Sequence, residues 1–128
     1  MMTILALQRN LFQQDRDLRK GLWAGSYVQG PPLATEVIGK TLGILGFGHI
    51  GKEVARLAEA FQMEIRSLRS GHSRAELESV LEASDFLVLA CPLTPETLGL
   101  IGSAELARMR PSSLGEENSA PATPSSAP

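Results

Sequence analysis

Three closely spaced glycines are the residues of this sequence best suited to binding a phosphate. Gly46, Gly48 and Gly51 form the pattern G-x-G-x-x-G, which follows a short apolar run at 41–45 and opens a stretch of helical periodicity at 50–61. In that context the first glycine permits a tight turn and the second lets a pyrophosphate approach bare backbone. The third lets the helix pack closely on the strand. The pattern predicts a dinucleotide-binding loop at a helix N-terminus; the alternative is a turn that needs glycines only for packing.

A second phosphate-binding motif overlaps the same glycines. The spacing from Gly46 to Gly51 and Lys52 matches the first seven positions of a mononucleotide P-loop. The eighth position of that motif is Ser or Thr, whose hydroxyl holds Mg²⁺, whereas this chain has Glu53. Because a carboxylate there adds negative charge beside a triphosphate, a P-loop protein is the weaker alternative.

The elements that must position this loop alternate between strands and helices. Three runs have strand length and apolar character, at residues 41–45, 63–68 and 85–90. The third is expected to be a fully buried strand of a parallel sheet. The helix that follows the glycines carries four apolar residues whose spacing places them on one face: Ile50, Val54, Leu57 and Phe61.

Two further helices complete the pattern. Ser73 and Glu76 form an S-x-x-E capping box that opens a helix through Ala83, and a short helix is expected at 103–109 before Pro111. The order β-α-β-α-β predicts an α/β fold, a truncated Rossmann-like doubly wound parallel sheet with right-handed crossovers.

The two ends of the chain differ from this central part. Residues 3–20 are expected to form one amphipathic helix, and Trp23 and Tyr27 to be packing residues of the loop that follows. From Ser112 onward there are three prolines and one large aliphatic residue, a composition typical of disorder. We therefore divide the chain into three parts: a helix and loop at 1–36, a partial dinucleotide-binding domain at 37–111 and a disordered tail at 112–128.

Composition excludes several classes of protein. A chain of 128 residues allows one small domain, and its net charge of −2 argues against electrostatic binding of nucleic acid. The single cysteine excludes an internal disulfide, no apolar run has membrane-spanning length, and the first residues lack the features of a signal peptide. We expect a cytoplasmic protein and assign no metal ligands.

Two longer motifs carry a family resemblance. The run IGKTLGILGFGHIG at 38–51 and the run SDFLVLACPLTPET at 84–97 resemble the nucleotide-binding domain of D-isomer-specific 2-hydroxyacid dehydrogenases, and the similarity covers roughly residues 3–111. Within that family the second run is most similar to glyoxylate/hydroxypyruvate reductases. The resemblance implies an NAD(P)-dependent oxidoreductase that acts on a CH–OH group.

The resemblance also implies which residues meet the cofactor. His49 and Ile50 match the pair whose backbone faces the pyrophosphate, Cys91 and Pro92 match the strand end on the nicotinamide side, and Thr97 matches a cofactor-contacting threonine. For Cys91, a buried small apolar residue is the alternative. The expected cofactor-binding set is Gly46, Gly48, His49, Ile50, Gly51, Arg69, Ser70, Cys91, Pro92 and Thr97.

One departure from the family concerns the cofactor. Most members end the second strand with Asp, which binds the adenosine ribose, whereas this chain has Arg69 followed by Ser70. An arginine there suits the 2′-phosphate of NADP(H), so NADP(H) is favoured over NAD(H). The alternative is a solvated surface arginine.

A second departure concerns catalysis. In the family, the arginine, glutamate and histidine of the active site follow the segment that matches Met109 to Pro111, and here the sequence diverges at Ser112. Neither His49 nor His72 matches the catalytic histidine, and the family's N-terminal substrate-binding part has no counterpart. We assign no catalytic residue and expect a truncated chain that is inactive alone. The alternative is a non-catalytic module that forms a dimer with itself or docks on a full-length relative.

Overall fold

The computed structural model describes residues 1–22 and 36–111. The predictions for Trp23, Tyr27 and the tail from Ser112 lie outside these residues. Within the described ranges, no helix has the length and apolar character needed to cross a membrane.

Three parallel strands form the sheet at the centre of the fold. They are β1 (Thr41–Leu45), β2 (Glu64–Leu68) and β3 (Phe86–Leu89). Their spatial order is β2-β1-β3, so β1 is central and the chain reverses its direction of winding after β2. At their carboxyl ends, Leu45 pairs with Leu68 on one side and with Leu89 on the other. The predicted truncated Rossmann-like parallel sheet is confirmed.

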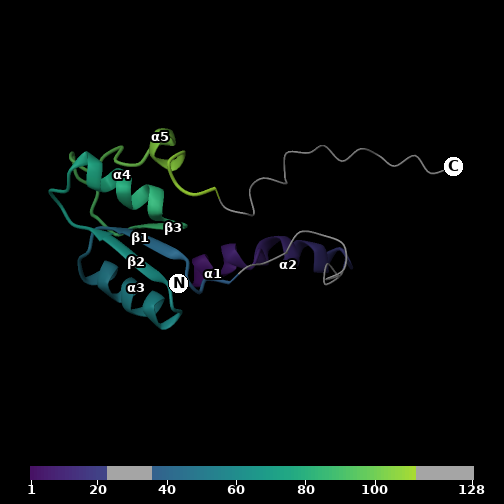
Figure 1. The fold of residues 1–128 in the computed structure, drawn as a ribbon. Coiled ribbons are helices and arrows are strands. Elements are labelled where there is room, and N and C mark those ends of the chain that lie inside the picture. The colour runs from purple at the N-terminus through teal and green to yellow at the C-terminus, as the bar shows by residue number, and fades with distance from the viewer. Residues whose placement is uncertain (23–35, 112–128) are drawn as a thin grey trace.

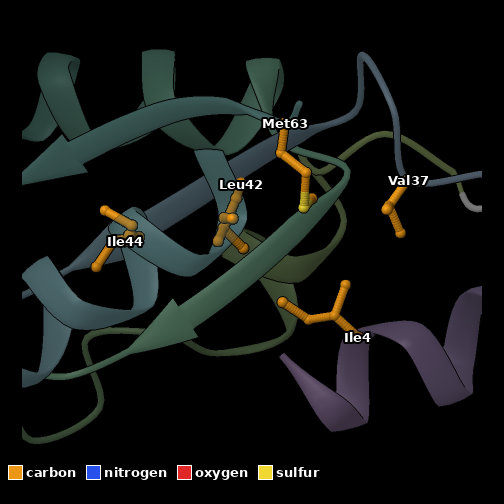
Figure 2. Packing of buried hydrophobic residues seen from close by; sticks show 7 residues of the cluster. Ile4, Val37, Leu42, Ile44 and Met63 are labelled. Carbon is orange, nitrogen blue, oxygen red and sulfur yellow. The ribbon is translucent and has the colours of Figure 1, made fainter. Parts of the chain in front are cut away.

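Helices cover both faces of this sheet (Figure 1). One face is covered by α3 (His49–Ala60), and the opposite face is covered by α4 (Arg74–Ala83). Alternate residues of β1 face these two layers: Leu42 and Ile44 belong to the cluster with α3, whereas Leu45 packs with the residues of α4. Figure 2 shows the first cluster, in which Ile4 and Met63 lie near Leu42.

The fully buried residues of α3 are all small: Gly51, Ala55 and Ala58. Of the four apolar residues that share one face by their spacing, Val54 is partly buried and packs against the core. Ile50 is 70% exposed, and Leu57 and Phe61 are also exposed. A Cβ on Gly51 would collide with the carbonyl oxygen of Gly46 and would lie 3.2 Å from Ile44 Cγ2, so this glycine allows the close approach of helix and strand that the glycine pattern predicts.

The helix predicted over residues 3–20 is divided in two. It consists of α1 (Met2–Gln8) and α2 (Leu11–Arg19), separated by Asn10 in the left-handed conformation with φ 49°. Asparagine adopts this conformation at lower cost than most residues. The break lets α1 bury Ile4 against the core while α2 buries none of its residues, which the apolar periodicity alone did not reveal.

The third strand is less buried than predicted. β3 is half-buried rather than fully buried, and Leu89 is 57% exposed. In the described part of the chain β3 pairs only with β1, which makes it an edge strand.

The final helix, α5 (Ser103–Leu106), is shorter than the predicted 103–109. It is tied to α4 by a salt bridge of 2.7 Å between Arg74 and Glu105.

Candidate functional site

The glycine loop begins where β1 and β3 end side by side. Gly46 has φ +97°, and a Cβ built on it would lie 2.5 Å from the backbone nitrogen of Cys91 and 2.6 Å from the carbonyl carbon of Ala90. The N–H of Ala90 donates a 2.8 Å hydrogen bond to the carbonyl of Leu45, which locks the two strand ends together. This is the switch point of the sheet, the position at which open α/β folds bind ligands. Only glycine fits at residue 46.

The start of α3 offers backbone donors to an anion. Gly48 is the N-cap residue, and no side chain caps the helix there. The first N–H groups of a helix have no partner within it, and here they belong to His49, Ile50 and Gly51. A Cβ on Gly48 would meet nothing within 4 Å, so its backbone is open to approach. This donor set and the bare backbone fit the pyrophosphate of a dinucleotide.

The residues predicted to read the adenosine ribose lie on the β2 side of this loop. Arg69 and Ser70 follow the end of β2, and both are exposed. The N–H of Gly46 donates a 2.9 Å hydrogen bond to the carbonyl of Leu68, so the end of β2 is joined to the glycine loop. The sheet thus brings Arg69 next to the loop, as the family resemblance implies for a ribose-reading residue.

The residues predicted for the nicotinamide side lie on a loop that its own hydrogen bonds hold in shape. Cys91 is partly buried and Pro92 is exposed. The hydroxyl of Thr97 donates to the carbonyl of Pro92 at 2.7 Å and accepts from the N–H of Thr94 at 2.8 Å. The hydroxyl proton of Thr97 is therefore used within the loop. A contact between Thr97 and a cofactor would therefore use the methyl group of Thr97 or the remaining lone pair of its hydroxyl oxygen.

The two histidines of the chain lie at the glycine loop and in the turn after β2. His49 is exposed at the start of α3, and the Nδ1 atom of His72 lies 2.8 Å from the carbonyl oxygen of Arg69, in the turn after β2. In the strand order β2-β1-β3, His72 and Cys91 lie on opposite sides of β1. Among residues 1–22 and 36–111, no three His, Cys, Asp or Glu side chains gather where they could hold a metal ion.

One neighbour of the site was missed by the sequence interpretation. The guanidinium carbon of Arg69 lies 6.0 Å from the centroid of the Phe47 ring. The available signal was Phe47, an aromatic residue between the first two glycines. Phe47 lies two residues after the end of β1, which pairs with the end of β2. Such a signal becomes informative only when the strand register is known.

Comparison with known proteins places this geometry in a family. Residues 1–114 match the NAD binding domain of D-isomer specific 2-hydroxyacid dehydrogenases. The glyoxylate reductase of Thermococcus gammatolerans is 41% identical over 124 residues, an alignment that covers 87% of this chain and 37% of that protein. This chain therefore spans little more than a third of the length of that relative.

Two solved structures show the same fold. A glycerate dehydrogenase related protein from Thermoplasma acidophilum has a TM-score of 0.69 at 32% identity, covering 84% of this chain and 38% of that one. An acyclic imino acid reductase, solved in complex with NADPH and D-Arg, has a TM-score of 0.69 at 30% identity, covering 83% of this chain and 36% of that one.

Proposed function

This chain belongs to the D-isomer specific 2-hydroxyacid dehydrogenase family, and we propose that it holds a nicotinamide dinucleotide across the carboxyl ends of β1 and β3. The observation that carries the proposal is the bare backbone of Gly48 at the uncapped start of α3, beside the close contact between Gly46 and Cys91. The residues assigned to the cofactor are Gly46, Gly48, His49, Ile50, Gly51, Arg69, Ser70, Cys91, Pro92 and Thr97.

The preferred cofactor is NADP(H). Arg69 and Ser70 are exposed at the end of β2, and an arginine can form charge-assisted hydrogen bonds with a 2′-phosphate. Arginine offers no acceptor to an unphosphorylated ribose, which the acidic residue of NAD-dependent relatives provides. The solved relative that holds NADPH supports this choice as a precedent within the fold.

The proposed role is the cofactor-binding part of a glyoxylate reductase-like oxidoreductase. A bound nicotinamide dinucleotide supplies the hydride in such chemistry. The residues of this chain bind and orient it, since neither His49, at the glycine loop, nor His72, in the turn after β2, matches the catalytic histidine that the family resemblance implies. We therefore propose that the 128-residue chain binds its cofactor without reducing glyoxylate or hydroxypyruvate by itself.

Calorimetric titration of the purified chain with NADPH and NADH tests the proposal. We expect weak binding of both and tighter binding of NADPH. Replacing Arg69 with Asp removes the phosphate contact and places like charges together, so the preference should vanish or reverse. Arg66→Asp is the matched control, because Arg66 is an exposed arginine in the middle of β2, three residues before Arg69. Equal affinities in the wild-type chain, unchanged by Arg69→Asp, would contradict the NADP(H) assignment.

Steady-state assays test the second half of the proposal. Oxidation of NADPH with glyoxylate or hydroxypyruvate should not exceed the background rate. Turnover that follows the protein through purification, and that Gly48→Val abolishes, would show that this chain carries its own catalytic residues.

A second candidate role is association through α2, with a second copy or with a longer relative. This helix buries none of its residues, and large apolar side chains are exposed on it and just after it: Leu11, Phe12, Leu18 and Leu22. Leu11 and Leu18 are seven residues apart and so lie on the same helix face. An exposed apolar face of this kind is typical of an interaction site.

Sedimentation analysis tests this association. Leu18→Glu should shift a dimer toward monomer, whereas Thr3→Glu, which adds the same charge at an exposed position of α1, should not. A wild-type chain that is monomeric at all concentrations would contradict the dimer.

We also propose a cytoplasmic location, because a single cysteine suits a reducing compartment. Fractionation of cells that express the chain tests this location.

A further inference from the structure

The ring of Phe47 lies close to the guanidinium group of Arg69, at the edge of the glycine loop. The distance from the guanidinium carbon to the ring centroid is 6.0 Å. At this range the quadrupole of an aromatic ring attracts a cation. The two residues come from different strand ends, because Phe47 follows β1 and Arg69 follows β2.

The sheet determines where these two residues start. Leu45 and Leu68 are paired in the ladder between β1 and β2, and the next residue of β1, Gly46, donates a 2.9 Å hydrogen bond to the carbonyl of Leu68. The backbone positions of Phe47 and Arg69 are thus held by the last rungs of the ladder. Their approach follows from the register of the strands.

The two side chains differ in how they are anchored. Phe47 is partly buried and packs against the core cluster that contains Leu42 and Ile44. Arg69 is exposed, and in the described part of the chain it forms no salt bridge. Its carbonyl oxygen lies 2.8 Å from the Nδ1 atom of His72. A fixed ring therefore faces a charged group that is available to an anion.

We propose that Phe47 is a specificity-determining positioning residue, which orients the Arg69 guanidinium toward the 2′-phosphate of NADP(H). This inference rests on the proposed function, in which Arg69 reads that phosphate. Stacking on Phe47 limits the conformations of a long side chain before the ligand arrives, so less freedom is lost on binding. NADH has a hydroxyl at that position and gains nothing from the oriented charge.

The test uses Phe47→Leu and Phe47→Tyr in the 128-residue chain, titrated with NADPH and with NADH. Leucine keeps an apolar contact with the core and removes the ring, whereas tyrosine keeps the ring. We expect Phe47→Leu to weaken NADPH binding about two- to fivefold, the range of an exposed cation–π contact. The affinity for NADH should stay unchanged, and Phe47→Tyr should retain the NADPH affinity of the wild-type chain.

A measurement without cofactor tests the contact directly. In the Phe47→Leu variant the NMR resonance of the Arg69 Nε proton should lose its ring-current shift, and in Phe47→Tyr it should keep it. No change in Phe47→Leu overturns the inference. Equal weakening of both cofactors by Phe47→Leu also overturns it, because a disturbed loop explains that result.

An Arg69→Ser variant separates the two hypotheses. An NADPH preference that depends on Arg69 but survives Phe47→Leu leaves the proposed function intact and overturns the positioning role alone. A wild-type chain without any preference, or a preference that survives Arg69→Ser, overturns both.

Discussion

The carboxylate of Asp85 accepts a 2.8 Å hydrogen bond from the backbone N–H of Thr41, while the N–H of Asp85 donates a 2.9 Å hydrogen bond to the carbonyl of Thr41. This reciprocal pair joins the start of β1 to the residue before β3. Two cations lie near the same carboxylate, with Lys40 at 3.9 Å and Arg110 at 3.5 Å. Asp85 therefore aligns the two strands whose opposite ends form the proposed cofactor site.

Removing this carboxylate should destabilise the domain. Asp85→Ala leaves the Thr41 N–H without its partner, and hydrogen bonds to charged groups contribute about 1.5–3 kcal/mol. Asp85→Asn can still accept that bond and loses only the attraction to Lys40 and Arg110, which is worth about 1 kcal/mol or less at a partly exposed position. Urea denaturation of both variants gives the two free energies of unfolding. Equal losses would show that charge, rather than the bond to Thr41, is what matters.

A methyl group added at Gly43 should also cost stability. A Cβ there would collide with the hydroxyl oxygen of Ser84, and it would lie 3.0 Å from Leu87 Cδ1 and 3.2 Å from Val80 Cγ1. Ser84 is fully buried and donates a 2.6 Å hydrogen bond to the carbonyl of Val80, so it has little room to move. Overpacking of this kind typically costs about 1–3 kcal/mol. A Gly43→Ala variant whose midpoint in urea equals that of the wild-type chain would contradict this reading of the packing.

The elements that the sequence predicted best are those held by local chemistry. The capping box is one: the N–H of Ser73 donates to Glu76 at 2.7 Å, and the N–H of Glu76 donates to the Ser73 hydroxyl at 3.3 Å. Both partners lie within three residues, so the pattern S-x-x-E contains the whole interaction. The strand, glycine turn and helix around Gly46 were predicted because their signals also lie in one continuous stretch of sequence.

The errors concern interactions between distant parts of the chain. Periodicity placed the large apolar residues of α3 on one face, and it did not reveal that the fully buried residues of this helix are Gly51, Ala55 and Ala58. The break at Asn10 separates α1, which buries Ile4 in the core, from α2, which buries no residue. In each case the deciding contact lies on another element, and one sequence does not reveal its position.

The attachment of α5 should depend on pH. Glu105 has a side chain only 11% exposed, and it accepts a 2.9 Å hydrogen bond from the N–H of Gly102 and a 2.7 Å bond from Arg74. These donors hold the pKa of Glu105 below its ordinary value of 4.5. The unfolded chain thus binds the proton more readily than the folded one, so this group's contribution to stability is complete above pH 4.5. It is lost as the pH falls through the lowered pKa.

Comparison with Glu105→Gln isolates this effect. The difference in unfolding free energy between the wild-type chain and the variant should be largest near pH 7 and should shrink as the pH falls below 4.5. Glu59→Gln provides the control, since Glu59 is exposed and has no side-chain hydrogen bond or salt bridge within the described residues. A difference that is constant from pH 7 to pH 3 would contradict the role of the ionised carboxylate.

The glycines of the site and of the sheet should respond differently to the same added methyl group. Gly48 has φ −87°, which any residue adopts, and a Cβ there meets nothing within 4 Å. Gly48→Ala should therefore leave the free energy of unfolding unchanged. The methyl group would project into the space that the pyrophosphate needs, so both NADPH and NADH should bind at least about tenfold more weakly, a loss of about 1.4 kcal/mol.

Gly43→Ala should show the reverse, with reduced stability and nearly wild-type affinity in the molecules that remain folded. Calorimetric titration and urea denaturation of the two variants measure both quantities, and unimpaired binding by Gly48→Ala would mean that the dinucleotide does not approach the chain at this loop.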